Sequence, residues 1–537
     1  MTETETLQAD VIVVGGGLGG VAAALAAARR GRSVVLTEET DWLGGQLTSQ
    51  GVPPDEHPWI ERFGASASYR RLREAIREEY RTWYPLTAEA MRHPALNPGL
   101  GKVSKLCHEP SVSARVIDAM LAPHIAAGRL RVLREARPVA ASADGGVVRS
   151  VTVRQSGRDL ALRGAFVLDA TELGDVLPLA GIPYVTGFES RDETGEPSAP
   201  LHAQPRNVQS FSWVFALGYE AGADHVIDRP DDYDFWRAYE PAFWGGPMLG
   251  LVAPDPRTLT PFARTFDPTS PVSTGVDADQ SKDPGDRELW AFRRILAQAN
   301  FEPGFLTSDV TIVNWPMIDY LEGDVLDVTP AERDRHLAGA RSLSTSMLYW
   351  LQTEAPRPDG GRGWAGLHLR GDVLGTVDGF AKAPYHREAR RIRARSTVVE
   401  QDLSLAVRGG RGAAAYRDSI GIGMYRIDLH PSTTGDNYLD VASSPFQIPL
   451  GALIPAGGGN LLAAAKNIGT THITNGCYRL HPVEWSIGEA AGALAAHCLD
   501  TGTSPDEVHA DDRRLRQFQD TLVAEGVELA WPEVKGF

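Results

Sequence analysis

The chain has 537 residues, enough for two or three lobes of about 150 residues each. Hydrophobic residues make up 42% of it and charged residues 23%, the balance of an ordinary globular protein. With 69 acidic and 53 basic residues the net charge is −16, which argues against nucleic acid or an anionic membrane as the main partner. We therefore expect a small-molecule substrate, and the sequence leaves the oligomeric state open.

The cysteines and the first residues indicate a compartment. Cys107, Cys477 and Cys498 are odd in number, widely spaced and without a C-x-x-C pair, so we expect neither a disulfide framework nor a metal site. The acidic residues 1–6 lack the basic segment of a secretion signal. No run of about 18 apolar residues is present that would span a membrane. These features predict a cytoplasmic protein.

Residues 9–38 have the pattern of a nucleotide-binding βαβ unit. The apolar run at 11–14 predicts a strand buried on both faces of a parallel sheet. Residues 21–30 contain many alanines and no Gly or Pro, which predicts a helix. Residues 34–36 predict a second buried strand. This order of elements is typical of a Rossmann-like α/β fold.

Three glycines join the first strand to the helix. Gly15 allows a tight turn, Gly17 lets the backbone approach a pyrophosphate, and Gly20 lets the helix pack closely on the strand. The helix N-terminus adds free N–H groups for the phosphates. Glu38 or Glu39 follows the second strand, where an acid accepts hydrogen bonds from a ribose. Together these residues predict a dinucleotide site.

Further strands are expected at 130–133, 147–154 and 160–170, separated by Gly-containing turns. The last strand delivers Asp169 and Thr171 to the carboxyl end of the sheet, where open α/β sheets bind ligands. These side chains are therefore candidates for cofactor contact.

The composition changes from about residue 183 to 400, where Pro, Trp, Tyr and Asp increase. Residues 331–351 predict a long helix, and the Pro/Ser/Thr/Asp-rich stretch 255–286 predicts exposed irregular surface. We interpret this region as an inserted lobe that shapes the substrate pocket. Its tryptophans are expected mostly in the core, with one or two forming pocket walls: Trp213, Trp244, Trp315 and Trp350.

Two later patterns leave alternatives open. The run from Gly410 to Ala415 imitates a second dinucleotide loop, but it lacks a buried strand before it and an acid after it. Arg426, Asp428 and His430 alternate onto one face of an expected strand, facing either a pocket or solvent.

The last buried strand is expected at 461–465, and a helix at 482–499 begins with Pro and is followed by Gly502. Buried strands thus recur far apart, and a second βαβ unit for NAD(P)H is missing. That pattern fits one long cofactor bound by an interrupted domain. We expect a cofactor domain in two parts, residues 1–182 and 441–502, with a mixed α+β substrate domain between them at 183–440. A terminal helix and tail follow at 503–537.

Several segments carry a resemblance to a known family: Gly15 to Gly20, Trp42-Leu-Gly-Gly-Gln-Leu-Thr, Asp169-Ala-Thr-Glu-Leu-Gly-Asp, Asn314-Trp-Pro, Tyr385 to Ile392, Gly469-Thr-Thr-His to Arg479, and Gly488-Glu-Ala-Ala-Gly. With them the chain resembles the FAD-dependent oxidoreductases, glutathione-reductase-like flavoproteins near the fumarate reductase and tRNA-modifying branch. The resemblance implies a glutathione-reductase-type FAD-binding domain. It implies FAD contacts at Gly15, Gly17, Gly20, Glu38, Glu39, Gly45, Gln46, Leu47, Thr171, Asn467, Ile468 and Thr470.

Three departures narrow the resemblance. No C-x-x-x-x-C is present, so the chain does not match a disulfide reductase. The segment 42–49 has no His, so we expect non-covalent FAD. The Gly-Asp of aromatic hydroxylases is replaced by Lys466-Asn-Ile-Gly.

These features predict hydride transfer from a small organic metabolite to flavin N5, with reoxidation by oxygen or another acceptor. The N-terminus of the 482–499 helix would stabilise charge on the reduced flavin. The alternatives are a monooxygenase, a redox-neutral flavoenzyme, or a non-catalytic electron relay.

Three residues near this helix are candidates for catalysis. His472 is either catalytic or a structural histidine, Arg479 clamps an anionic substrate group or a backbone carbonyl, and His481 serves the site or caps the turn. Cys107 and Cys477 are expected to be buried apolar residues. A weaker candidate near the flavin is His108.

Overall fold

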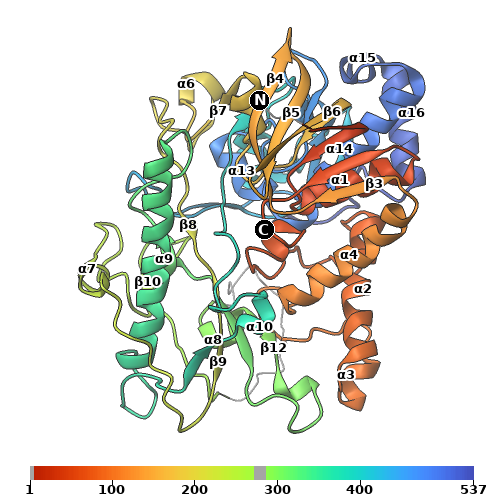
Figure 1. The fold of residues 1–537 in the computed structure, drawn as a ribbon. Helices are drawn as coiled ribbons and strands as arrows, with labels where there is room; N and C mark the ends of the chain where they lie inside the picture. Colours follow the sequence, from red (N-terminus) through yellow and green to blue (C-terminus); the bar gives the residue numbers. More distant parts are fainter. Residues whose placement is uncertain (1–4, 271–285) are drawn as a thin grey trace.

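The computed structural model describes residues 5–270 and 286–537 (Figure 1). Its main sheet has the order β3-β2-β1-β6-β5-β4, with β21 pairing the end of β6. β1, β2, β3, β6 and β21 pair in parallel, which confirms the expected α/β fold class. The parallel strands are β1 (Glu5–Val14), β2 (Val34–Thr37), β3 (Leu130–Leu133), β6 (Arg158–Asp169) and β21 (Leu461–Ala463).

Two antiparallel strands extend this sheet, β4 (Ala136–Asp144) and β5 (Val147–Gln155). The sequence pattern does not predict β4, because this edge strand is rich in alanine and mostly exposed, and its register shifts after Pro138. An edge position tolerates both features, so pairing with β5 overrides the weak local preference.

Two helices cover one face of the sheet and cross each other closely, α1 (Leu18–Arg29) and α14 (His481–Thr501) (Figure 1). A Cβ atom on Gly488 would lie 1.9 Å from the carbonyl oxygen of Gly19, and one on Gly492 would lie 2.1 Å from that of Ala23. The contact is therefore backbone against backbone, and it confirms the expected helix near the end of the chain.

The other helices of this lobe lie farther out. α2 (Ala67–Trp83), α3 (Ala88–Arg92) and α4 (Pro110–Ala126) follow β2, and α15 (Pro505–Ala510) and α16 (Asp512–Ala524) follow α14. None of the helices within the described ranges is both long and apolar enough to cross a membrane.

A four-stranded antiparallel sheet and one long helix, α9 (Pro330–Thr353), build the middle of the chain. The sheet has the order β12-β13-β9-β15, and α9 confirms the predicted helix. A second hydrophobic core lies here, in which Trp244, Trp315 and Trp350 are buried. The strands are β9 (Phe215–Tyr219), β12 (Arg294–Leu296), β13 (Val310–Val313) and β15 (Leu367–Leu369).

The remaining strands form short two-stranded pairs. In the stretch 255–286, β11 pairs with the strand just before it, and residues 271–285 lie outside the described part of the chain. The proposed division at residues 182, 440 and 502 stays a prediction. The pairs are β7 (Tyr184–Val185) with β16 (Arg391–Ile392), β8 (Phe211–Ser212) with β14 (Asp319–Tyr320), β10 (Val252–Pro254) with β11 (Pro261–Ala263), β17 (Ser419–Gly423) with β20 (Phe446–Pro449), and β18 (Ile427–Leu429) with β19 (Leu439–Val441).

The remaining helices are short. They are α5 (Val176–Ala180), α6 (Arg191–Thr194), α7 (Tyr233–Ala238), α8 (Leu289–Phe292), α10 (Gly371–Leu374), α11 (Glu400–Leu403), α12 (Leu405–Arg408) and α13 (His472–Tyr478).

Candidate functional site

A cavity of about 290 Å³ lies at the carboxyl ends of β1, β2 and β6. We call it the nucleotide cavity. The middle lobe closes its other side with Trp213, Arg333 and Lys382, among others. Six of the predicted cofactor residues line it: Gly15, Gly17, Glu38, Glu39, Gly45 and Thr171.

Bare backbone forms one wall of the nucleotide cavity. Gly15 has φ +99°, and a Cβ there would lie 2.3 Å from the carbonyl oxygen of Ala170. A Cβ on Gly45 would lie 2.9 Å from the Cα of Gly17, so these glycines approach each other without side chains. Gly20 does not line the cavity; its Cβ would lie 1.9 Å from the oxygen of Gly15, which fits the predicted packing role.

Glu38 is held at the end of β2 by three donors. Gly16 N donates to its Oε2 at 3.1 Å, and the backbone N and hydroxyl of Thr40 each donate to Oε1 at 2.8 Å. Burial raises the pKa of Glu38 to about 8, although Thr40 acts in the opposite direction. Neighbouring Glu39 also lines the cavity, and burial followed by the charge of Asp175 raises its pKa to about 7.

Two acids and one lysine lie beside the glycine wall. Glu172 pairs with Lys466 through Oε2, while its Oε1 has no partner in the described chain. Glu484 accepts from Gly19 N at 3.4 Å and from Gln46 Nε2 at 2.5 Å. Burial raises the pKa of Glu484 to about 7, with Lys466 opposing and Glu172 adding to the shift. Lys466 is thus the cation that opposes the charges of these two acids.

This wall fits a flavin dinucleotide. The close glycines leave room for a pyrophosphate, and Glu38 stands where a ribose would lie.

Several of the expected FAD contacts lie outside the lining of the nucleotide cavity, and their contact with FAD stays a prediction. Asn467 donates to the carbonyl oxygen of Asp169 at 3.0 Å and accepts from Ala465 N at 3.2 Å, so it ties the ends of β6 and β21 together. Leu47 and Ile468 are buried apolar side chains. None of these three, nor Gln46 or Thr470, lines the nucleotide cavity. Sequence position alone does not separate a residue that faces a ligand from one that supports its wall.

A second cavity, of about 160 Å³, lies between the ends of several distant segments. We call it the polar cavity. It is lined by Asp55, Val103, Asp255, Pro256, Arg257, Arg264, Asp286, Leu289, Phe292, Arg293, Asn314, Trp315, Pro316, Tyr425, Arg426, Asp428, His430, Tyr438, Asp440 and Phe537.

The predicted alternation around β18 brings Arg426, Asp428 and His430 to this polar cavity. Nδ1 of His430 lies 2.5 Å from Oδ2 of Asp319, a fully buried carboxylate that also pairs with Arg387 at 2.9 Å. Nε2 of His430 lies 3.9 Å from Oδ2 of Asp428, on the cavity side. Burial and then Arg387 lower the pKa of His430, while Asp319 opposes them. The ring is therefore neutral near pH 7.

Arg479 lies behind the wall of the polar cavity. It donates to the Tyr385 hydroxyl at 2.6 Å and to the backbone carbonyl oxygen of Asp428 at 3.2 Å, and it lies 3.4 Å from Oδ2 of Asp428, which lines that cavity. Arg479 is 3% exposed and lines neither cavity, so it holds neighbouring groups in place rather than facing open space.

His481, the first residue of α14, contacts the backbone of the loop that carries Asp55. Its Nδ1 accepts from Asp55 N at 3.0 Å, and its Nε2 lies 3.3 Å from the carbonyl oxygen of Val52. Burial lowers the pKa of His481 to about 4. Both ring nitrogens are engaged with backbone, so His481 holds this loop and has no free lone pair for proton transfer.

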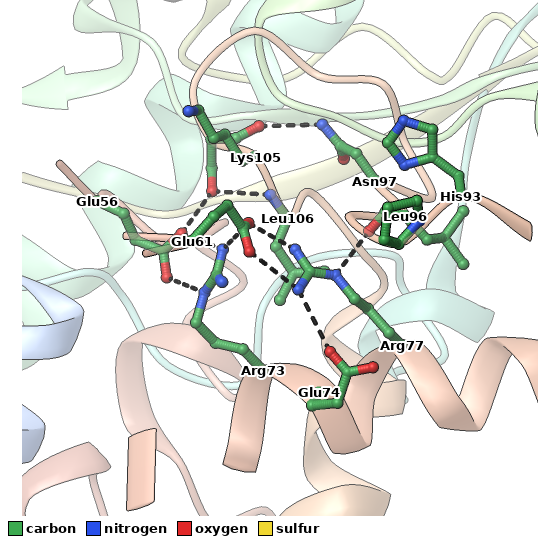
Figure 2. A network of polar contacts seen from close by, with 12 residues as sticks. Glu56, Glu61, Arg73, Glu74, Arg77, His93, Leu96, Asn97, Lys105 and Leu106 are labelled. Atoms are coloured by element: carbon green, nitrogen blue, oxygen red, sulfur yellow. Dashed lines mark hydrogen bonds and ion pairs between the residues drawn. The ribbon is translucent and has the colours of Figure 1, made fainter. Parts of the chain in front are cut away.

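A buried ionic network holds the same loop from the side of α2 (Figure 2). Glu56 accepts from Arg73 at 2.8 Å and from the Ser104 hydroxyl at 3.2 Å. Arg73 and Arg77 both pair with Glu61, at 2.7 and 2.6 Å. The network fixes the backbone beside Asp55.

His472 lies apart from both cavities. It is 1% exposed, its Nδ1 lies 2.9 Å from Oε1 of Glu388, and its ring lies 3.8 Å from that of Phe188. His108 is likewise held, by the Leu106 carbonyl at 2.8 Å and by Ser113. These contacts are structural.

All three cysteines are buried and free. Burial raises the pKa of Cys107 to about 12, and that of Cys477 also rises. The expected apolar role of Cys107 and Cys477 is confirmed.

Comparison with known proteins identifies the family. The family model described as FAD dependent oxidoreductase matches residues 10–522. The FAD-dependent monooxygenase ntnJ of Nectria sp. is 35% identical over 102 residues, which cover 19% of this chain and 24% of that protein. Two solved structures show a distant likeness that carries no argument about activity. p-Nitrophenol 4-monooxygenase PnpA from Pseudomonas putida DLL-E4 is 13% identical over 97% of this chain and 89% of that chain, with a TM-score of 0.34. L-proline dehydrogenase from P. horikoshii is 17% identical over 36% and 26%, with a TM-score of 0.18. Because the family match spans nearly the whole sequence, this protein belongs to the FAD-dependent oxidoreductases, and its cofactor is FAD.

Proposed function

We propose that this protein is an FAD-dependent dehydrogenase or oxidase whose substrate binds in the polar cavity. The observation that carries the proposal is His430, which lines the polar cavity and contacts the buried Asp319 through Nδ1. Bound FAD would supply the hydride acceptor for a substrate C–H bond. The protein's own part is to hold the substrate and to accept the proton that leaves its O–H or N–H group.

His430 is suited to accept that proton. Asp319 takes the Nδ1–H hydrogen bond and so leaves the Nε2 lone pair for the cavity. The lowered pKa of His430 keeps the ring unprotonated near neutral pH. Arg479, which also donates to the Tyr385 hydroxyl, helps to hold Asp428 beside His430.

Anaerobic reduction of the purified holoenzyme tests the proposal. A panel of small alcohols, amines and carboxylic acids is mixed with the enzyme, and the flavin absorbance band is followed by stopped flow. We expect at least one compound to bleach the band without oxygen, and peroxide to appear on re-aeration if oxygen is the acceptor. A flavin that no substrate reduces without a nicotinamide donor would contradict the proposal.

A monooxygenase is the second candidate, since the Nectria relative carries that name over the 102 matched residues. Isotopically labelled oxygen separates the two. Label in the organic product would identify a monooxygenase, whereas label only in peroxide or water would identify an oxidase.

A further inference from the structure

The polar cavity holds two charged groups whose hydrogen-bonding capacity is unmatched. Nε and Nη1 of Arg293 and Oδ1 of Asp55 are buried without a hydrogen-bond partner among residues 5–270 and 286–537. Nη2 of Arg293 lies 3.8 Å from Oδ1 of Asp55, too far for a hydrogen bond. Buried donors and acceptors of this kind cost free energy unless something binds them.

The neighbouring charges are already paired. Of the other ionic groups that line the cavity, Arg264 pairs with Asp286 at 2.5 Å and Arg426 pairs with Asp440. Arg479 forms an ion pair with Asp428, and Arg257 also has an interaction partner. Arg293 thus keeps two donors without a partner among the described residues, while Asp55 and Asp286 each keep one such oxygen. Of these two acids, Asp55 is the one that forms an ion pair with Arg293.

Uncharged donors surround Arg293. Ile312 N donates to the carbonyl oxygen of Arg293 at 3.0 Å, so Arg293 and Asn314 lie at the same end of the β12–β13 pair. Asn314 is 4% exposed, yet neither atom of its amide has a partner in the described ranges. The Tyr438 hydroxyl and the Trp315 indole N–H are also without partners there. The site thus offers several donors around one guanidinium, and one carboxylate beside it.

We propose that the polar cavity binds a small zwitterionic amino acid, its carboxylate on Arg293 and Asn314 and its ammonium group on Asp55. An amino acid carries its two charges on neighbouring atoms of one short unit, which matches an Arg–Asp pair 3.8 Å apart. A guanidinium binds a carboxylate through two parallel hydrogen bonds. A ligand with one charge would leave Arg293 or Asp55 uncompensated.

The volume and the apolar residues of the polar cavity limit the size of the ligand and the type of side chain that it carries. Its volume of about 160 Å³ is below the roughly 300–1,000 Å³ of pockets for drug-sized ligands. Phe292, Trp315 and Phe537 give it apolar walls beside the polar groups. A compact amino acid with an apolar or aromatic side chain fits both. This inference rests on the proposed function, which makes the polar cavity the substrate site.

Calorimetric titration of the holoenzyme tests the ligand class. The probes are the L and D enantiomers of the common amino acids. For the amino acid that binds most tightly, its 2-hydroxy analogue and its decarboxylated amine are titrated as well. We expect the amino acid to bind at least about tenfold more tightly than either analogue, because each lacks one charge-assisted contact. The proposal is overturned if no amino acid binds, or if the amine or the hydroxy acid binds equally well.

Two variants locate the contacts. Arg293→Gln is expected to weaken amino-acid binding by about 10- to 100-fold. Asp55→Asn is expected to weaken the amino acid but not the hydroxy acid. The control is Arg149→Gln, whose side chain is 60% exposed on β5 and pairs only at the surface with Asp144. Unchanged thermal unfolding shows that the variants fold, and unchanged affinity in Arg293→Gln would overturn the assignment.

The same samples separate this inference from the proposed function. If an amino acid binds through Arg293 but never reduces the flavin anaerobically, the proposed function fails and the binding site stands. If an amine or alcohol reduces the flavin equally well in Arg293→Gln, the proposed function stands and the amino-acid assignment fails.

Discussion

At the scale of single residues, hydrogen-bond satisfaction separates structural from functional candidates. His472 and His481 are buried with their ring contacts fixed by Glu388 and by backbone. His430 has one nitrogen fixed by Asp319 and the other facing the polar cavity. The histidine suited to proton transfer is therefore His430, which sequence reasoning ranks below His472.

His430→Gln should lower substrate-dependent flavin reduction by about 10²- to 10⁴-fold, the usual contribution of a positioned base. In the wild type the rate should fall as pH drops through the pKa of His430, which burial and Arg387 hold below its ordinary value against Asp319 and Asp428. Stopped-flow reduction between pH 5 and 9 measures both effects. His225→Gln, an exposed histidine, is the control. A variant that keeps the wild-type rate and pH profile would exclude this role.

His472→Gln should lower stability by about 1–3 kcal/mol, because it removes a partner of the buried Glu388. Burial alone would raise the pKa of Glu388, but His472 and Arg391 hold it at about 2. An acid with a depressed pKa stabilises the fold above its unfolded-state pKa of about 4.5 and loses this contribution as pH falls toward 2. Chemical denaturation should therefore show a larger gap from wild type at pH 6 than at pH 3. An equal gap at both pH values would contradict the ion-pair role.

The sequence predicts the nucleotide side of the site better than the substrate side. Gly15, Gly17 and Glu38 lie within one βαβ unit, so their spacing alone places them together. Arg293 and Asp55 come from segments far apart in the chain, and no local pattern links them. The sequence marks this second site at Asn314-Trp-Pro, one of the motifs that carry the family resemblance, and at the alternation of Arg426, Asp428 and His430.

At the scale of elements, the fold depends on how closely α1 approaches its neighbours. Gly19 packs against Ala464, Gly20 against Gly15, and Gly488 against Gly19, each at a distance that excludes a Cβ. Composition predicts these helices well, because they are rich in alanine and other small apolar residues. It does not predict edge strand β4, whose alanines and Pro138 have weak preference for any element.

Gly488→Ala should force α1 and α14 apart, because its Cβ would meet a backbone oxygen that cannot move alone. We expect a loss of about 1–3 kcal/mol in stability, together with a lower FAD content, since the first turn of α1 borders the nucleotide cavity. Thermal unfolding and the flavin absorbance of purified protein measure these. Gly410→Ala is the matched control, as nothing lies within 4 Å of a Cβ there. Equal behaviour of the two variants would show that the helix contact is not strained.

At the scale of the whole molecule, the nucleotide cavity lies between two lobes with separate hydrophobic cores. The glycine loop comes from one lobe, and Trp213, Arg333 and Leu337 come from the other. FAD bound in this cavity would contact both lobes, and its binding energy would add to the contact between them.

Removing FAD should loosen the lobe contact without unfolding either core. Hydrogen exchange in the first turns of α9, which carry Arg333 and Leu337, should accelerate at least about tenfold in the apoprotein. Helix α16, which does not border the cavity, should exchange at the same rate in both forms. Equal acceleration in α16 would indicate general destabilisation instead.

The position of Phe537 has a practical consequence for expressing the protein. This residue lines the polar cavity and hydrogen-bonds through its carbonyl oxygen to Ser443 N at 3.2 Å. A purification tag fused after it would emerge at the cavity wall and crowd any incoming ligand. A tag fused ahead of β1 would leave from the exposed end of that strand, where Glu5 lies beside Leu160 of β6. Protein tagged ahead of β1 is therefore the form to use for titrations.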